Sequence, residues 1–431
     1  MNAFRSIPFA FVAGMVLVSL ARAQDPAANP PAPPPATARA AAWREDLRFI
    51  ADELPKRHAN AFHTVTRDDW AGRVAAIDVA IPSLADHEVV CRLAALVAAV
   101  GDAHTSLDAR ARLGAYPVQL KAFADGVYVV AATEPHTDLI GARVASIDGT
   151  ATPAAREAVG AMATRENDVM RTMQTTRALA VPEALHAFGV TTSPESAEFA
   201  FERDGSGFTR VLTPLERGTP VAWKLPEALT GADAPIYLRD QRSAYWWTWL
   251  DDGKIVYAAY NSCADDPQRP FRKFATEVID AVNGKAPGHE GVVPEKLVID
   301  VRNNGGGNSG VATPLIMTLR SHTGINRRGR LFVLIGARTQ SSAMMNALQL
   351  RRATDAILVG EPTGGRPKSY GEIKEMKLPR SALSVWYSTK YWKQIEGEDP
   401  PSVMPDVHAE PSAAEFFAGR DVVMEKVRSW E

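Results

Sequence analysis

The second half of the chain contains three short apolar runs with helical patterns between them, and these runs constrain the fold most strongly. They are KLVIDV, RLFVLIG and AILVG, beginning at Lys296, Arg330 and Ala356. Apolar runs of this length are typical of strands buried on both faces, and their alternation with helices is typical of parallel sheets. We therefore predict an α/β fold with a parallel or mixed sheet in this region.

The composition indicates a folded globular protein without a strong charge bias. The 431 residues are 46% hydrophobic and include 48 Lys and Arg against 50 Asp and Glu, a formal net charge of −2. This balance argues against nucleic acid as a partner. The two cysteines exclude a disulfide scaffold and a zinc site built from four cysteines, but Cys91 and Cys263 could pair in an oxidising compartment.

The amino-terminal segment predicts export. Residues 1–23 place Arg5 before an apolar run and end with Ala-Arg-Ala, the pattern of a cleaved signal peptide. The apolar run is too short to cross a membrane as a helix. Residues 24–40 are rich in proline and alanine, which favours an extended tether. We therefore predict a soluble exported protein, periplasmic in a Gram-negative bacterium and otherwise secreted.

Three zones of different pattern follow the predicted tether. Residues 41–112 show the apolar spacing of helices, and residues 113–215 show strand patterns with a hairpin turn at Asp204-Gly205. Residues 216–431 contain the alternating strands and helices. We predict a helical segment, a small mixed α/β module and an α/β core, in that order.

A glycine-rich turn follows the first of the three apolar runs. Gly305, Gly306 and Gly307 are consecutive, and a helical pattern begins near Val311. Such a turn leaves backbone N–H groups free at a helix start, which suits an anion or a developing oxyanion. The segment also matches G-x-G-x-x-G, but the acid that a dinucleotide site needs about 20 residues later is absent. We therefore expect no nucleotide cofactor.

Ser341 and Ser342 follow the second apolar run, where a helix is predicted to begin. A serine there lies beside unsatisfied N–H groups and the positive end of the helix dipole, as a nucleophile would, but serine is also a favoured N-cap. The sequence leaves both interpretations open. His104, in GDAHTSL with Asp102 two residues earlier, is the best candidate for a base. The same local pattern also fits an ordinary surface histidine.

Other histidines give weaker signals. His87 and Cys91 lie four residues apart in a predicted helix and could share a metal ion, but the sequence shows no third ligand. His58 and His63, five residues apart, do not form a convincing pair either. We therefore expect no metal site.

Five segments occur in an order that resembles the S41 peptidases, the family of tail-specific and tricorn-type proteases. They are GDAHTSL, LVIDVRNNGGGNS, RTQSSAMMNA, VGEPTGGRPKSYGE and LPRSALSVWYSTKYW. The resemblance runs from about Trp43 to the C-terminus. It implies a ClpP/crotonase-like catalytic core over residues 216–431 and a PDZ-like module with an insertion over residues 113–215. It also implies peptide or unfolded protein substrates without a cofactor, and leaves the oligomeric state open.

The resemblance assigns roles to individual residues. The family motif T-x-S-x-x-E matches TQSSAM, so Ser341 is the expected nucleophile and Ser342 the fallback. The motif D-L-R-x-N-x-G-G matches DVRNNGGG. This match assigns one oxyanion donor to the backbone N–H of Gly306, or of Gly307 if the turn is shifted. The backbone N–H of Ser342 is the other expected donor.

Branches of the family differ in the base that activates the serine. One branch uses the lysine of T-x-G-K-G, but the matching TGGRP has Arg366, which stays protonated. Lys368, two residues later, is the alternative base. The tricorn-like branch uses a histidine from the N-terminal part of the chain, and Asp102 and His104 match its D-x-H motif. We therefore expect His104 to be the base.

These assignments predict an exported serine endopeptidase that acts by acyl transfer from Ser341. Glu372 is the first candidate for the carboxylate that orients the imidazole, with Asp102 and Glu361 as alternatives. The alternative function is a catalytically silent ligand- or peptide-binding protein on the same scaffold. Met344, which stands where the family motif has an acid, keeps that alternative open.

Overall fold

The computed structural model describes residues 36–431, which divide into two compact units. We call residues 36–226 with 369–392 the N-terminal unit, and residues 227–368 with 393–431 the α/β unit. The predicted signal peptide and most of the predicted tether lie outside the described residues. No described helix combines the length and the apolar character needed to cross a membrane.

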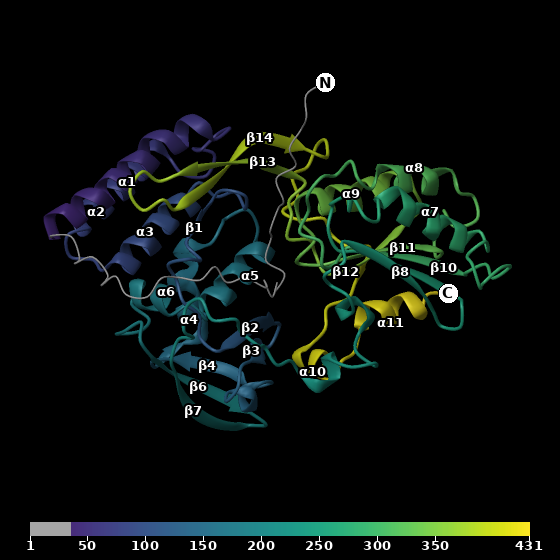
Figure 1. The fold of residues 1–431 in the computed structure, drawn as a ribbon, viewed down its shortest axis with the longest axis horizontal. Helices are drawn as coiled ribbons and strands as arrows, with labels where there is room; N and C mark the ends of the chain where they lie inside the picture. Colours follow the sequence, from purple (N-terminus) through teal and green to yellow (C-terminus); the bar gives the residue numbers. More distant parts are fainter. Residues whose placement is uncertain (1–35) are drawn as a thin grey trace, which may run out of the picture. The chain divides into compact units, whose positions relative to one another are not determined.

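The N-terminal unit begins with helices that share one apolar core. They are α1 (Ala36–Arg57), α2 (Arg67–Ala80) and α3 (Asp86–Ala98). The first helix already starts in the alanine-rich end of the segment assigned to the tether, since alanine is the best helix former. Apolar side chains of β13 (Lys368–Lys377) and β14 (Ser384–Lys393) complete the core. Figure 1 shows these two long strands beside α1, and β14 also pairs antiparallel with β1 (Ser106–Asp108).

The middle of the N-terminal unit is an antiparallel sheet in the order β2-β3-β4-β6-β7, with β5 paired to β4. The strands are β2 (Val118–Phe123), β3 (Gly126–Ala132), β4 (Arg143–Ile147), β5 (Thr150–Ala151), β6 (Ala197–Arg203) and β7 (Ser206–Leu212). The predicted hairpin turn joins β6 to β7, and Asp204 and Gly205 have φ of 50° and 76°. Positive φ at both positions is what a type I′ turn requires.

Helices pack against this sheet, and short turns link several of the elements. The helices are α4 (Thr152–Val159), α5 (Asp168–Ala178) and α6 (Pro182–Ala187). The 3₁₀ turns of this unit are η1 (Thr137–Leu139) and η2 (Gly160–Met162), whereas η3 (Glu227–Leu229) and η4 (Ile236–Leu238) belong to the α/β unit. Apolar residues of α4 and α6 join those of the strands in one buried cluster, which fixes both helices on the sheet.

The α/β unit is built on a mixed sheet in the order β15-β12-β11-β10-β9-β8. Its strands are β8 (Tyr245–Leu250), β9 (Ile255–Tyr260), β10 (Lys296–Asp300), β11 (Leu331–Ile335), β12 (Ile357–Gly360) and β15 (Val407–His408). Only the pairing of β8 with β9 is antiparallel among these described strands. The three apolar runs are therefore parallel strands, which confirms the predicted mixed α/β architecture.

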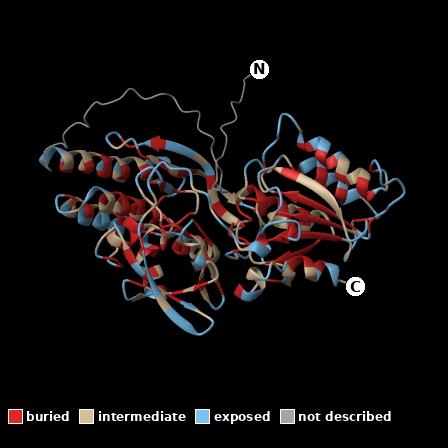
Figure 2. Ribbon diagram, turned by 60° about the horizontal axis from the view of Figure 1, so that its bottom comes forward, coloured by how far each residue is buried: buried red, intermediate tan, exposed pale blue. Residues whose placement is uncertain are grey.

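Helices cover both faces of this sheet. Figure 1 shows α7 (Phe271–Val282), α8 (Thr313–Ser321) and α9 (Ser341–Ala353) on one face and α11 (Val422–Arg428) on the other, with α10 (Ala413–Phe417) nearby. The central strands are buried almost throughout, as Figure 2 shows. Burial on both faces explains why their sequences lack alternation of polar and apolar residues. The carboxyl ends of β10 and β11 lead into the glycine-rich turn and the serine pair.

Candidate active site

Ser341 lies at a sharp turn between a strand and a helix in the α/β unit. It is the first residue of α9, and residues 336–340 connect it to β11. Its φ is 49°, a conformation that costs a non-glycine residue about 1–3 kcal/mol. A serine on a strained strand-to-helix turn is the geometry of a nucleophile elbow.

The side chain of Ser341 does not cap the helix. The N-cap residue of α9 is Gln340, which makes no side-chain capping bond. Within residues 36–431, no hydrogen bond engages the Ser341 hydroxyl, and the residue is half-buried. The N-cap interpretation that the sequence left open therefore does not apply to Ser341, and its hydroxyl is available for chemistry.

Glycines surround Ser341 more closely than other residues could. A Cβ atom on Gly306 would lie 2.7 Å from the Cβ of Ser341, and one on Gly365 would lie 3.1 Å from the Ser341 backbone nitrogen. The φ of Gly306 is 107° and that of Gly307 is 132°, both unfavourable for other residues. A Cβ on Gly307 would meet the carbonyl oxygen of Cys263 at 2.4 Å. Close backbone approach therefore explains the glycine run.

The backbone N–H groups near Ser341 differ in their availability. The Gly306 N–H donates to Asn304 Oδ1 at 2.9 Å. The Gly307 N–H makes no hydrogen bond within the described residues, since the bridge between Cys263 and Gly307 is formed by the neighbouring peptides. The Ser342 N–H, in the first turn of α9, is also without a partner there. Of the two glycines named for the oxyanion, Gly307 therefore has the free donor.

Ser342 has a different environment from Ser341. Its side chain is buried, and its hydroxyl donates to the carbonyl of Gly307 at 2.7 Å. Thr339 Oγ1 likewise donates to the carbonyl of Val301 at 2.8 Å. These bonds hold the turn after β11 against the turn after β10. The second serine thus has a structural contact that the first lacks.

A cluster of buried polar groups around Cys263 packs against the glycine turn. The Cys263 thiol contacts Asn304 Oδ1 and Asn346 Oδ1, each at 3.5 Å, and the Cys263 N–H donates to the carbonyl of Gly306 at 3.0 Å. Burial raises the pKa of the Cys263 thiol to about 11, so it remains a neutral donor. Cys91 is also a buried free thiol. Neither described cysteine forms a disulfide.

The lysine alternative and its neighbours are engaged elsewhere in the α/β unit. Lys368 Nζ donates to the carbonyl of Gly397 at 2.6 Å. Arg366 forms an ion pair with Asp399 at 2.7 Å. Met344 is fully buried in α9, and Glu361 follows β12 in a half-buried position. No hydrogen bond in the described part of the chain links Lys368 to Ser341.

His104 lies in the N-terminal unit, in the turn between α3 and β1. Bonds from separate segments fix this turn. Thr164 Oγ1 donates to the carbonyl of Gly101 at 2.7 Å, and the N–H of Ala103 donates to Glu166 Oε2 at 2.8 Å. The His104 N–H donates to Asp102 Oδ1 at 2.9 Å. The backbone that carries the imidazole is therefore held in one conformation.

Carboxylates lie beside the His104 ring. Asp102, His104 and Glu166 each offer one side-chain atom of a kind that can ligate a metal ion, and these three atoms lie within 4.8 Å of one another. Both acids are buried. The Nδ1 atom of His104 is buried and has no hydrogen-bond partner within the described residues. This group could orient a catalytic imidazole or hold a cation. Sequence patterns did not predict Glu166 as a site residue, because no motif connects it to His104.

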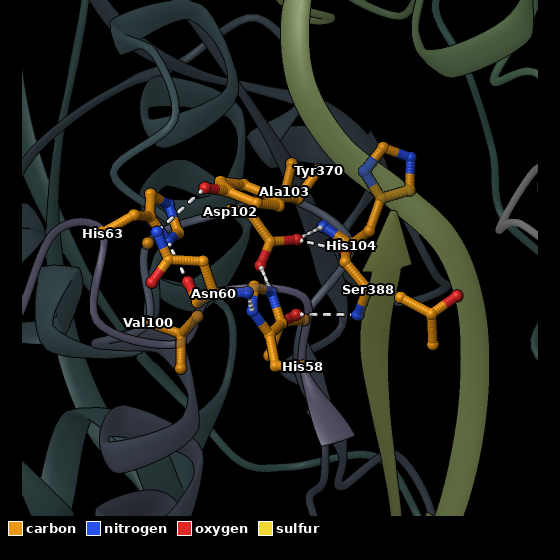
Figure 3. Close-up of polar contacts among 12 residues, drawn as sticks. His58, Asn60, His63, Val100, Asp102, Ala103, His104, Tyr370 and Ser388 are labelled. Carbon is orange, nitrogen blue, oxygen red and sulfur yellow. Dashed lines mark hydrogen bonds and ion pairs between the residues drawn. The ribbon is translucent and has the colours of Figure 1, made fainter. Parts of the chain in front are cut away.

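A second histidine, His58, binds the carboxylate of Asp102 directly, as Figure 3 shows. Its Nε2 lies 2.8 Å from Asp102 Oδ2, and its Nδ1 accepts the N–H of Asn60 at 2.9 Å. The proton of a neutral His58 is therefore on Nε2. Ser388 Oγ donates to Asp102 Oδ1 at 2.8 Å. No sequence motif predicted the contact between His58 and Asp102, since the two residues are 44 positions apart.

The Asp102 carboxylate is buried but remains ionised. Burial alone would raise its pKa, but hydrogen bonds from the side chains of His58 and Thr105 and the nearby His104 hold the pKa well below its usual range. The side chains of His58 and Asp102 are 0% and 2% exposed. The ionised Asp102 carboxylate, held by His58, therefore anchors the turn that carries His104.

Glu372, the first candidate from the sequence, is exposed on β13 with a φ of 57°. Its backbone carbonyl accepts a hydrogen bond from Thr389 Oγ1 at 2.5 Å. The described residues contain no hydrogen bond between the Glu372 carboxylate and His104. The acids that lie beside the imidazole within this unit are Asp102 and Glu166.

Comparison with known proteins identifies the fold. No protein-family model matches the chain, and no curated protein matches its sequence. The structure of mature CPAF complexed with lactacystin aligns with 91% of this chain and 98% of its own, at 13% identity and a TM-score of 0.61. A serine-to-alanine mutant of CPAF aligns over 91% and 99%, at 13% identity and a TM-score of 0.60.

The chain therefore has the fold of CPAF over nearly its whole described length. A putative S41 protease from Bacteroides fragilis aligns over 73% of this chain and 82% of its own, at 11% identity and a TM-score of 0.32. The fold assignment rests on the CPAF structures. The predicted resemblance to S41-type peptidases is thus confirmed at the level of the fold.

Proposed function

We propose that the chain is an exported serine endopeptidase of the S41 type with Ser341 as its nucleophile. The observation that carries the proposal is the strained position of Ser341 at the start of α9. Its hydroxyl has no partner within the described residues, and a glycine turn with a free N–H lies against it. A fold shared with CPAF gives independent support.

In the proposed reaction, His104 accepts the proton of the Ser341 hydroxyl as the oxygen attacks a peptide carbonyl. The N–H groups of Gly307 and Ser342 stabilise the resulting oxyanion. Collapse of the intermediate breaks the peptide bond, and the leaving amine takes the proton from His104. Water then attacks the acyl-enzyme with His104 again as base, releasing the second product and restoring the hydroxyl.

The proposed orienting carboxylate is Glu166 or Glu372. Glu166 accepts a hydrogen bond from Ala103 and lies in the same group as the His104 ring. Asp102 already accepts bonds from His58, Ser388 and the backbone of His104, which favours an anchoring role. The resemblance to S41 peptidases is what supports Glu372. The effect of each acid on turnover distinguishes them.

The remaining parts of the proposal concern the scaffold. We assign a ClpP/crotonase-like core to the α/β unit and a PDZ-like module to the antiparallel sheet around β4. The segment 165–189, which forms α5 and α6, is the proposed insertion into that module. Export rests on the pattern of residues 1–23.

Cleavage of an unfolded polypeptide tests the function. The chain from Gln24 onward is incubated with denatured casein, and new amino termini are measured for the unsubstituted protein and for Ser341→Ala, His104→Ala and Lys368→Ala. We expect cleavage by the unsubstituted protein and by Lys368→Ala only. Loss of cleavage in Lys368→Ala with retention in His104→Ala would reassign the base. Tight peptide binding without cleavage by any form would instead indicate the binding function.

A further inference from the structure

The N-terminal unit contains a second histidine pair, between helices α3 and α6. His87 Nε2 and His186 Nδ1 lie 2.8 Å apart, although the residues are 99 positions apart in sequence. Both side chains are half-buried. The two ring nitrogens face each other, so at most one of them carries the proton between them and the other presents a lone pair. This pair has no part in the proposed peptidase reaction.

A carboxylate completes a set of three ligands. One oxygen of Glu88, the His87 ring and the His186 ring offer ligand atoms that all lie within 4.8 Å of one another. Nitrogens bound to a tetrahedral Zn²⁺ at about 2.05 Å lie about 3.3 Å apart, so the observed 2.8 Å must widen by about 0.5 Å. Rotation of the half-buried rings is enough for a change of that size.

The surroundings hold the ligands in place. Arg92 donates to the carbonyl of Ala187 at 2.9 Å, and the Cys91 thiol contacts the carbonyl of Glu183 at 3.7 Å. Both contacts join α3 to α6 within two helical turns of the histidines. The Cys91 thiol, which the sequence suggested as a partner for His87, is thus directed at a backbone carbonyl. The structure provides His186 and Glu88 instead.

Glu88 lies in the first turn of α3, next to His87 in the chain. Glu88 also accepts the N–H of Ala85 through Oε2 at 2.8 Å, a bond that steadies its carboxylate at the start of α3.

We propose that His87, His186 and Glu88 bind a divalent transition-metal ion of the Zn²⁺ class, with water as the fourth ligand, and that the ion clamps α3 to α6. Two imidazoles and one carboxylate form a ligand set that suits Zn²⁺ and not Ca²⁺ or Mg²⁺, which prefer oxygen ligands alone. Since α3 leads into the His104 turn, bound metal stabilises the unit that carries the proposed base. The binding itself is independent of catalysis.

Titration of the metal-free protein with Zn²⁺ tests the proposal. Calorimetry measures the affinity for Zn²⁺, and the visible spectrum of the protein with Co²⁺ in place of Zn²⁺ reports the coordination geometry. We expect one strongly bound ion, the intense visible absorption of non-octahedral Co²⁺, and a higher melting temperature with Zn²⁺. His87→Gln, His186→Gln and Glu88→Gln should each weaken binding at least about tenfold. Glutamine retains a hydrogen-bonding side chain, so the metal-free variants should still fold, as circular dichroism would show.

His136→Gln is the matched control, since His136 lies in the same unit outside the ligand set. It should bind Zn²⁺ like the unsubstituted protein. Glu166→Gln tests the other candidate group of Asp102, His104 and Glu166. Weaker binding in Glu166→Gln and unchanged binding in His87→Gln would place the ion there and overturn the proposal. Absence of Zn²⁺ binding at tens of micromolar would overturn it as well.

Discussion

Gly306 lies so close to Ser341 that a Cβ atom on the glycine would be 2.7 Å from the Cβ of the serine. Heavy-atom contacts of a real Cβ atom essentially never fall below 3.0 Å. The turns after β10 and β11, adjacent parallel strands, therefore meet at these two residues. The proposed nucleophile and the proposed oxyanion turn are a single packed structure.

Gly306→Ala should abolish peptide cleavage. The added methyl group displaces either Ser341 or the turn, and the positive φ at this position adds strain of about 1–3 kcal/mol. Gly231→Ala is the control, because Gly231 has a φ of 81° but open space around its Cβ position. The cleavage rate and the melting temperature are measured for Gly306→Ala and Gly231→Ala and compared. Full activity in Gly306→Ala would mean that the close approach has no catalytic importance.

The two serines should differ in their effect on stability. Ser342→Ala removes the hydrogen bond to the Gly307 carbonyl and should lower the free energy of unfolding by about 1 kcal/mol. Ser341→Ala should leave that free energy nearly unchanged, since its hydroxyl has no partner within the described residues. Urea denaturation measures both. A greater loss for Ser341→Ala than for Ser342→Ala would show that the contacts are assigned wrongly.

Asp102→Asn should destabilise the protein in a pH-dependent way. The folded protein holds the pKa of Asp102 below its usual range, so the ionised carboxylate stabilises the fold above the unfolded pKa of about 3.9. That contribution is lost as the pH falls toward the lower folded pKa. We expect a deficit of about 2–3 kcal/mol at neutral pH, which shrinks below about pH 4.

Asp108→Asn is the matched control for this pH dependence. Asp108 pairs with Arg110 in a more exposed position, and such pairs contribute at most about 1 kcal/mol. Denaturation at neutral and acidic pH should therefore separate the two variants. If Asp102→Asn lowered the free energy of unfolding by the same amount at neutral and acidic pH, the charge of Asp102 would not be the cause of the stabilisation.

Glu166→Gln and Glu372→Gln distinguish the two proposed orienting acids. If Glu166 positions His104, Glu166→Gln should lower kcat on the order of 100-fold with little change in KM. The variant should stay folded, because glutamine can still accept the hydrogen bond from Ala103. Steady-state kinetics on a peptide substrate and its pH profile give the answer. A loss of kcat confined to Glu372→Gln would assign the orienting role to that residue.

The fold was predictable where local patterns determine it. The apolar runs at Lys296, Arg330 and Ala356 have no polar alternation, which only buried parallel strands explain well, and the structure has them at those places. The hairpin at Asp204-Gly205 was predictable because few dipeptides adopt positive φ at both positions. The helix start at Ser341 was also visible in the sequence.

The contacts of the candidate site were harder to predict, because they join distant segments. His58 and Asp102 are 44 residues apart, and Ala103 and Glu166 are 63 apart, with no motif to connect them. The partner of His87 was missed for the same reason, since His186 lies on another helix. Sequence patterns report the neighbours of a residue along one element, and these pairs depend on how elements pack.

Covalent labelling with a fluorophosphonate, followed by mass spectrometry of the labelled peptide, tests the central claim most directly. We expect a single adduct on Ser341, full labelling of Ser342→Ala and none of Ser341→Ala. An adduct on Ser342, or labelling that persists in Ser341→Ala, would contradict the assignment of Ser341 as the nucleophile.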